Sequence, residues 1–384
     1  MNKFVFNRAC FIGSNSINTL AEEITNRHLT KCFIVTDSGL IDCGLVQKVI
    51  SILIKNKIPS VLFSDVNAEP TVKDVKNAYN ELKRSEADFI LAIGGGSPID
   101  TAKAISVIYT NPKYADVVSL GGNKENLIAP LPVFAIPTTA GSAAEISKSF
   151  VVADEVVGKK IICFNDKAMP VETFIDAELL TTMPDVVTLS SGFDAFTHAL
   201  ESLLSNKANP LSKALAKEAL KLVVENLPLS YDEPENLEAR ENMAYAEYMA
   251  GMAYTNSGLG IVHSIAHGVA GKFNIPHGVV LSMFLCPVLK YNMYSPAASE
   301  YKYIAEAFGL NISGLSQEEV CRATIKEVEK FRNDFNIPKK LSDYGVAETD
   351  LDEIALNSFD DACTASNPRE VTMTDIYTIL KKVL

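Results

Sequence analysis

Short apolar runs alternate with longer amphipathic stretches in the first part of the chain. Three runs, CFIVT (32–36), SVLFS (60–64) and DFILAI (88–93), predict strands, and the stretches 39–57 and 72–85 between them predict helices. Each apolar run is continuous rather than alternating, which is typical of strands that are covered on both faces. The pattern therefore predicts an α/β domain with a parallel sheet.

Further apolar runs continue this pattern before the sequence changes character. These runs are PVFAI (132–136), SFVVA (149–153), KKIICF (159–164) and TFIDA (173–177). From residue 184 to 384 the chain is rich in Ala, Leu, Glu and Lys and has a longer, helical period. We therefore predict an α/β domain over residues 1–183 and an all-α domain over residues 184–384, without a repeat of fixed period.

Composition and charge exclude several classes of protein. Of the 384 residues 47% are hydrophobic, enough for a sizeable core, and the net charge of -12 leaves no basic stripe for a nucleic-acid backbone. The seven cysteines contain no C-x-x-C pair, as expected for reduced thiols in a cytosol. Polar residues interrupt the opening apolar run, and no apolar stretch reaches a membrane-spanning length. We expect a cytoplasmic protein with no membrane or nucleic-acid partner.

A glycine turn follows the third predicted strand. Gly94, Gly95, Gly96 and Ser97 lead onto the helix-like stretch TAKAISVIY (101–109). Such a turn lets the backbone approach a diphosphate, while the helix start offers free N–H groups and a positive dipole end. A turn with only a packing role is the alternative. The pattern is not G-x-G-x-x-G and does not follow the first strand, so it departs from the standard Rossmann fingerprint.

Two other segments are candidate cofactor contacts. Asp37 ends the first predicted strand, where a carboxylate accepts hydrogen bonds from a ribose and repels the 2′-phosphate of NADP. An ordinary helix N-cap is the alternative for this residue. The segment PTTAGSAAE (137–145) offers hydroxyls that suit a nicotinamide or a phosphate, or else it is a capped helix start.

The histidines are clustered in the second part of the chain. Only five occur, and four of them fall between residues 198 and 277. Asp194 and His198 are four residues apart, as are His263 and His267, so each pair shares one helix face; His277 follows in the turn-like IPHG. Any three or four of these side chains could bind a divalent metal, and a set without sulfur suits Fe(II), Zn(II), Mn(II) or Co(II). Core or capping roles are the alternative for each histidine alone.

Four segments, found in this order along the chain, resemble the iron-dependent, group III alcohol dehydrogenases. They are AIGGGSPID, PTTAGSAAE, DAFTHALES and GLGIVHSIAHGVAGKFNIPHG. The resemblance implies a dehydroquinate-synthase-like fold, NAD as cofactor, and Fe(II), with Zn(II) as an alternative, held by Asp194, His198, His263 and His277. It leaves His267 beside the nicotinamide, as a catalytic residue.

The resemblance also implies a set of cofactor-binding residues in the first domain. Asp37 falls near the adenosine ribose; the diphosphate is placed at Gly95, Gly96, Ser97, Pro98 and Asp100, and the rest of the cofactor at Thr138, Thr139, Ser142, Val151, Lys160 and Leu179. Glu69 is a departure, since many members have Asn there.

Two further segments, PKYADVVSL and SFDDACTASNPREVT, and the TTAGSAAE form of the second motif resemble the branch of the family that interconverts lactaldehyde and 1,2-propanediol. The resemblance implies a short alcohol or diol as substrate and a pocket that includes Ser149, Tyr254 and Cys363. Ser149 departs from the Asn of that branch, and Cys363 is either a pocket wall or a reactive thiol. Butanol-type and 1,3-propanediol-type dehydrogenases are alternatives.

Two rival classes are less well supported by the residues. A dehydroquinate-synthase-like lyase needs basic residues for a charged substrate, and few lie near the histidine segments. A non-catalytic scaffold would not require an intact glycine turn and ligand set. The resemblance also implies a homodimer or larger assembly, for which a strand formed by NKFVF (2–6) would offer an exposed edge.

Overall fold

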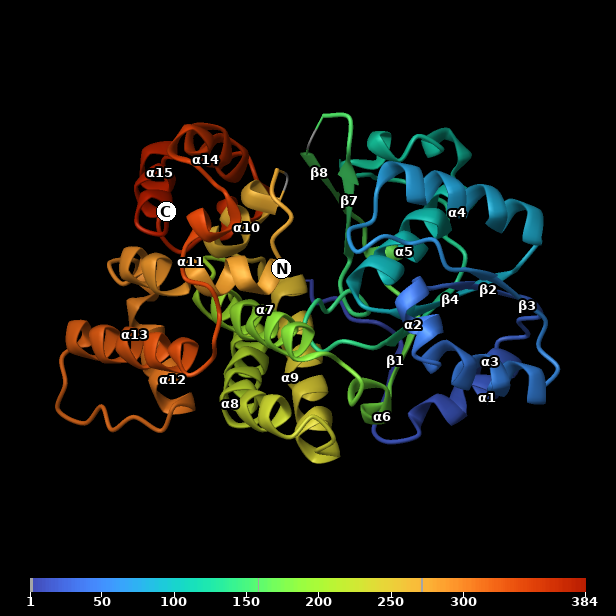
Figure 1. Ribbon diagram of the computed structural model, residues 1–384, viewed down its shortest axis with the longest axis horizontal. Helices are drawn as coiled ribbons and strands as arrows, with labels where there is room; N and C mark the ends of the chain where they lie inside the picture. The colour runs from blue at the N-terminus through green and yellow to red at the C-terminus, as the bar shows by residue number, and fades with distance from the viewer. Residues whose placement is uncertain (1–2, 158, 271) are drawn as a thin grey trace. The chain divides into compact units, whose positions relative to one another are not determined.

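The computed structural model describes residues 3–157, 159–270 and 272–384, and these residues form two compact units (Figure 1). The first unit ends at Met183 and also includes Pro234–Ala244. The second unit comprises Pro184–Glu233 and Tyr245–Leu384. The chain therefore divides after Met183, but a short segment beyond that residue belongs to the first unit.

The first unit is built around a parallel sheet of six strands. Its strand order is β1-β9-β6-β4-β2-β3, so neighbouring strands are joined by crossover connections. The strands are β1 (Ala9–Ile12), β2 (Cys32–Val35), β3 (Ser60–Phe63), β4 (Phe89–Gly94), β6 (Val133–Pro137) and β9 (Glu172–Ile175). The predicted α/β class with a parallel sheet is confirmed.

Helices cover both faces of this sheet, which explains the continuous apolar runs. On β2, Phe33 and Val35 belong to one hydrophobic cluster, and Cys32 and Ile34 belong to another. Figure 1 shows the helices of the first cluster and those of the second on opposite sides of the sheet. The first group contains α4 (Val72–Ser85) and α5 (Gly96–Thr110); the second contains α1 (Leu20–Asn26) and α3 (Leu45–Lys55). Two short helices, α2 (Ser38–Asp42) and α6 (Ala177–Leu180), also belong to this unit.

The edge strands differ from the sequence prediction. The run 60–64 was expected to be covered on both faces, but β3 lies at the edge of the sheet and exposes Ser60 and Leu62. The strand predicted at NKFVF is wrong for residues 3–6, which adopt no strand; β1 begins at Ala9 instead. The single helix predicted over 39–57 is interrupted at Gly44, whose φ of +78° separates α2 from α3.

A second, smaller sheet lies beside α5 in the first unit. It has the order β5-β8-β7, with β5 at Gly122–Asn123, β7 at Ser149–Asp154 and β8 at Lys159–Phe164. Strands β7 and β8 are antiparallel, and Val151 pairs with Ile162. This sheet carries Ser149, Val151 and Lys160, three of the predicted site residues.

The second unit is helical, as predicted. Its inner helices hold the histidines: α7 (Asp185–Leu204), α10 (Ile261–Ala270) and α11 (His277–Asn292). The remaining helices are α8 (Pro210–Asp232), α9 (Leu237–Ser257, which starts in the first unit), α12 (Tyr301–Ala307), α13 (Gln317–Asn333), α14 (Leu351–Phe359) and α15 (Met373–Lys381). Among the described residues, none of the helices has the length and hydropathy needed to cross a membrane.

Candidate functional site

Helix α7 provides the first two residues of a buried polar cluster. Asp194 and His198 lie four positions apart on a helix whose residues from Gly192 to Leu204 are all buried. The i, i+4 spacing places both side chains on one face, about one turn apart. Two polar side chains in so apolar a setting need polar partners, because burying them alone is costly.

Those partners come from α10 and α11. The Nε2 atoms of His198 and His263 each lie 3.4 Å from Oδ1 of Asp194, and Nε2 of His277 lies 4.0 Å from the same oxygen. The rings of His198 and His263 stack with centroids 4.7 Å apart. The structure therefore brings together all four residues that were predicted as metal ligands.

A close contact between two helices sets the position of His277. This residue begins α11, and the next residue, Gly278, donates its backbone N–H to Oγ of Ser190 on α7 at 3.1 Å. A Cβ atom at Gly278 would lie only 1.8 Å from the backbone oxygen of Ser190. Because glycine has no Cβ, α11 can begin against α7, and this contact places His277 near Asp194.

The charges in this cluster are strongly coupled. Burial alone would raise the pKa of Asp194, but the surrounding His198, His263 and His277 lower it to about 2. Burial alone would lower the pKa of His263, but hydrogen bonds to Asp194 and Glu201 raise it to about 9. The site therefore keeps an anionic carboxylate among nitrogen donors.

The donor set fits a divalent transition metal. Three imidazole nitrogens and one carboxylate oxygen, without thiolate sulfur, suit iron(II) or zinc(II) better than copper(I) or calcium. The side-chain donor atoms of Asp194, His263 and His277 all lie within 4.8 Å of one another. A bound cation would also neutralise the carboxylate that burial otherwise penalises.

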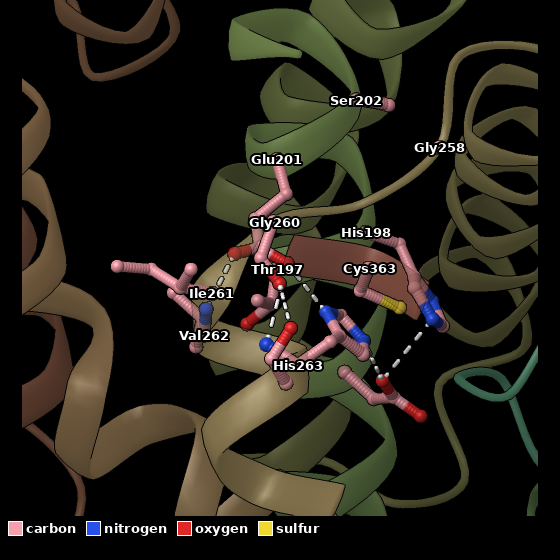
Figure 2. Close-up of polar contacts among 12 residues, drawn as sticks. Thr197, His198, Glu201, Ser202, Gly258, Gly260, Ile261, Val262, His263 and Cys363 are labelled. Carbon is pink, nitrogen blue, oxygen red and sulfur yellow. Dashed lines mark hydrogen bonds and ion pairs between the residues drawn. The ribbon is translucent and has the colours of Figure 1, made fainter. Parts of the chain in front are cut away.

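Glu201 is a part of this cluster that the sequence analysis missed. Its Oε2 lies 2.7 Å from Nδ1 of His263, and its Oε1 accepts a hydrogen bond from the backbone N–H of Val262 at 2.7 Å (Figure 2). The sequence held a signal for it, because residues 194, 198 and 201 share one helix face. Its carboxylate was missed because Glu201 contacts a predicted ligand and is not one of the predicted ligands itself.

His267 lies next to the cluster but outside the ligand set. Its ring stacks on that of His277, with centroids 5.6 Å apart and an interplanar angle of 10°. Its Nδ1 is 2.9 Å from Oδ2 of Asp361, a partner that sequence reasoning also missed. No periodic pattern connects Asp361 to His267, because 94 positions separate them.

The two predicted pocket residues of this unit lie close to these histidines. The ring of Tyr254 stacks on His198 with centroids 4.4 Å apart. Cys363 donates its backbone N–H to Oδ1 of Asp361 at 2.8 Å. Burial and the nearby Asp361 raise the pKa of the Cys363 thiol well above its usual range, which favours the neutral thiol over the thiolate.

The glycine turn and the segment 137–145 lie against each other in the first unit. The backbone N–H of Thr138 donates to the carbonyl oxygen of Gly94 at 3.1 Å. Cβ atoms at Gly95 and Gly96 would lie 3.3 Å from Thr139 and 3.1 Å from Ser142. Ser97 and Pro98 occupy the first turn of α5, which starts at Gly96. The segment 138–146 forms no helix, so the capped helix start considered for it is wrong.

Three other predicted cofactor residues make contacts within the protein. Asp37 caps α2 by accepting the N–H of Leu40 at 3.0 Å, which is the capping role considered from the sequence. Leu179 is buried in the core beside the sheet. Lys160 forms a 2.8 Å ion pair with Glu69, the residue that departs from the family pattern.

Asp100, which is partly exposed, forms an ion pair with the fully buried Lys103. Its Oδ2 accepts the backbone N–H of Val151 at 2.9 Å, and its Oδ1 lies 3.6 Å from Nζ of Lys103. Lys103 is fully buried and donates to Oγ of Ser147 and to the carbonyl oxygen of Ser149, both at 2.9 Å. Side chains of helix α5 therefore hydrogen-bond the backbone of strand β7 at residues 149 and 151. The sequence analysis did not single out Lys103.

Comparisons with known proteins agree with these features. Residues 7–177 match the model of iron-containing alcohol dehydrogenases, and residues 188–384 match the C-terminal part of the Fe-containing alcohol dehydrogenase family. The chain is 37% identical to the lactaldehyde reductase of Escherichia coli (strain K12), over 98% of this chain and 97% of that protein. It is 34% identical to the NAD-dependent methanol dehydrogenase of Bacillus methanolicus, over 100% of both.

The fold is also that of a solved relative. The crystal structure of a 1,3-propanediol oxidoreductase matches with a TM-score of 0.96 and 32% sequence identity, covering 100% of both chains. The predicted dehydroquinate-synthase-like fold is confirmed by this match and by the family model. The chain therefore belongs to the iron-containing alcohol dehydrogenase family.

Proposed function

We propose that this enzyme interconverts short primary alcohols or diols and their aldehydes with NAD as cofactor, and that lactaldehyde and 1,2-propanediol are its lead substrate pair. The name of the 37% identical relative supports this pair. The names of the methanol and 1,3-propanediol relatives support the broader class of short alcohols.

The observation that carries the proposal is the convergence of His198, His263 and His277 on Asp194. These four residues would hold iron(II), with zinc(II) as the alternative. When bound, the ion supplies Lewis acidity to the reacting oxygen, and NAD supplies the hydride acceptor. The helices around the four residues bury Asp194, His198 and His263, while the side chain of His277 is partly exposed.

His267 would handle the proton that the alcohol loses. Asp361 accepts a hydrogen bond from Nδ1–H, so Nε2 of the neutral ring carries the lone pair that accepts a proton. The stacking of this ring on His277 keeps it close to the ligand set. His267 therefore has both the position and the orientation for a proton relay.

The first unit would bind NAD through the glycine turn and the segment packed on it. The start of α5 offers backbone N–H groups to the diphosphate, and Thr138, Thr139 and Ser142 line the adjacent segment. Asp37 would accept the ribose hydroxyls and disfavour the extra phosphate of NADP. Its capping bond to Leu40 fixes the carboxylate in place for this role.

A substrate panel tests the proposal. Full-length enzyme reconstituted anaerobically with Fe(II) is assayed with NADH against lactaldehyde, glycolaldehyde, propanal, butanal and 3-hydroxypropanal. We expect turnover of short aldehydes, with the highest kcat/KM for lactaldehyde. A kcat/KM for lactaldehyde about tenfold below that for butanal, roughly 1.4 kcal/mol of transition-state binding, would instead assign a butanol-type enzyme. The highest kcat/KM for 3-hydroxypropanal would assign a 1,3-propanediol type.

Metal dependence is tested separately. We expect His263→Ala to lose bound iron and activity together, and His28→Asn, which removes a histidine of the first unit, to keep both. Full activity of a His263→Ala protein that is verified metal-free would rule out the metal-dependent mechanism.

A further inference from the structure

We propose that Glu201 is a positioning residue of the metal site, because one buried carboxylate holds both the ring of His263 and the beginning of the helix that carries it. The inference rests on the proposed metal-dependent function. It concerns a residue that would bind neither metal nor substrate. Its effect would be exerted through the ring of His263 and through the start of the helix that carries it.

The first contact fixes the ring of His263. Oε2 of Glu201 lies 2.7 Å from Nδ1, and an ionised carboxylate only accepts hydrogen bonds, so Nδ1 must carry a proton. In a neutral imidazole the lone pair is then on Nε2, the atom that lies 3.4 Å from Oδ1 of Asp194. The hydrogen bond therefore selects the tautomer that can bind a metal. It also makes Nε2 a more basic ligand.

The second set of contacts holds the start of α10. Oε1 of Glu201 accepts the N–H of Val262 at 2.7 Å, and Oε2 accepts the N–H of His263 at 3.4 Å. These two groups belong to the first turn of the helix and have no acceptor within it. A negative charge is also favourable at this end of the helix dipole. The backbone and the ring of His263 are thus tied to the same carboxylate (Figure 2).

The residues around Glu201 bury its carboxylate and leave room for it beside α10. Glu201 is only 4% exposed, so water does not compete for its hydrogen bonds. A Cβ atom at Gly260 would lie 2.7 Å from its Oε1, a distance at which a side chain does not fit. Figure 2 shows Gly260 beside Glu201 at the beginning of the helix. The glycine leaves the space through which the carboxylate reaches α10.

Replacing the carboxylate by an amide reverses one of the contacts. In Glu201→Gln the amide oxygen can still accept the N–H of Val262, but the NH2 group then faces Nδ1 of His263. That nitrogen would have to accept, which moves the ring proton to Nε2 and removes the metal-binding lone pair. We therefore expect Glu201→Gln to weaken metal binding without removing any ligand.

The test is Co(II) binding by metal-free, full-length protein in competition with a chromophoric chelator, together with the visible absorption of the bound Co(II). We expect Glu201→Gln to lower Co(II) affinity about 10- to 100-fold and to shift the absorption bands. The matched control is Glu218→Gln, which removes an exposed carboxylate of α8 and should leave both readouts unchanged. His263→Ala should lose tight binding altogether.

The outcomes separate the two proposals. If His263→Ala loses Co(II) but Glu201→Gln binds it with wild-type affinity and spectrum, the role of Glu201 is overturned and the metal site stands. If His263→Ala binds Co(II) like the wild type, the proposed metal site itself fails. Should Glu201→Gln not fold, Glu201→Asp keeps a carboxylate that is one methylene shorter, and wild-type affinity and spectrum in that folded variant would equally overturn the role.

Discussion

Asp361 holds the ring of His267, with Oδ2 of the carboxylate 2.9 Å from Nδ1 of the imidazole. The other carboxylate oxygen accepts from the backbone N–H of Cys363 at 2.8 Å and from Oγ of Ser264 at 3.3 Å. Three donors therefore fix one carboxylate, and the carboxylate fixes the ring. A histidine held in this way has a defined tautomer.

The first prediction follows from that arrangement. Asp361→Asn should lower kcat roughly 100-fold, the lower end of what a positioned acid–base group contributes, because the amide no longer enforces the proton on Nδ1. KM for NADH should change little. Steady-state kinetics measure both constants, and Asp360→Asn, at the neighbouring exposed position, is the control. An unchanged kcat in Asp361→Asn would remove His267 from the proton path.

The same carboxylate predicts a pH dependence of stability. Burial would raise the pKa of Asp361, but His267 and the hydrogen bonds from His267 and Cys363 hold it well below the usual range. The folded state thus keeps Asp361 ionised where the unfolded chain takes up a proton. This stabilisation is present above the unfolded pKa of about 4 and is lost as pH falls through the lower folded value.

Urea unfolding at a series of pH values checks this dependence. The difference in unfolding free energy between the wild type and Asp361→Asn should shrink as the pH falls below about 4. A difference that grows as the pH falls below about 4 would contradict the assigned direction of the pKa shift.

Cofactor preference gives the third prediction. Asp37→Asn keeps a side chain that caps α2 well but removes the charge that would face the 2′-phosphate of NADP. We expect kcat/KM for NADP to rise about tenfold, roughly 1.4 kcal/mol, with a smaller change for NAD. Asp42→Asn makes the same charge change at an exposed position of the same helix. An equal gain in that control would point to overall charge rather than a contact.

Substrate choice gives the fourth prediction. Ser149→Asn restores the amide that the lactaldehyde branch has at this position, and it leaves the backbone contact with Lys103 in place. The amide could hydrogen-bond the second hydroxyl, so the ratio of kcat/KM for lactaldehyde to that for propanal should rise about tenfold. Ser119→Asn, at an exposed position of the same unit, is the control. A ratio that does not move would remove Ser149 from the pocket.

The ion pair of Lys103 and Asp100 gives the fifth prediction. Lys103→Met should destabilise the protein by about 3 kcal/mol at pH 8, because it leaves the Asp100 carboxylate without its partner. Burial raises the pKa of Asp100 to about 6, so at pH 5 this carboxyl can take up a proton and the loss should be smaller. Lys76→Met, at an exposed position of α4, should cost little at either pH. Urea unfolding at both pH values measures the effect.

Local patterns predicted the parts of the fold that local chemistry determines. Helix α4 was predicted with its observed bounds, because its apolar spacing is regular and Thr71 and Asp74 form a capping box at its start. The parallel sheet followed from runs that are apolar on both faces. The antiparallel pairing of β7 with β8 could not be predicted, since an apolar run does not specify its neighbour.

The candidate site likewise contains residues that the sequence could indicate and residues that it could not. Asp194, His198, His263 and His277 could be chosen by residue type and spacing, and the family resemblance separated them from His267. Asp361 and Lys103 could not, because their roles come from contacts across the fold rather than from a periodic pattern. The sequence therefore indicates the predicted metal ligands more clearly than the residues that position other side chains or strands.

The contact between Gly278 and Ser190 restricts how this enzyme can be engineered. A side chain at position 278 would overlap the backbone of α7. A backbone, unlike a side chain, cannot adopt another rotamer to make room. A mutant library built to broaden substrate range should therefore keep Gly278 constant and vary positions such as Ser149 and Tyr254. A design that needs a larger residue at 278 must first redesign the crossing of α7 and α11 as a whole.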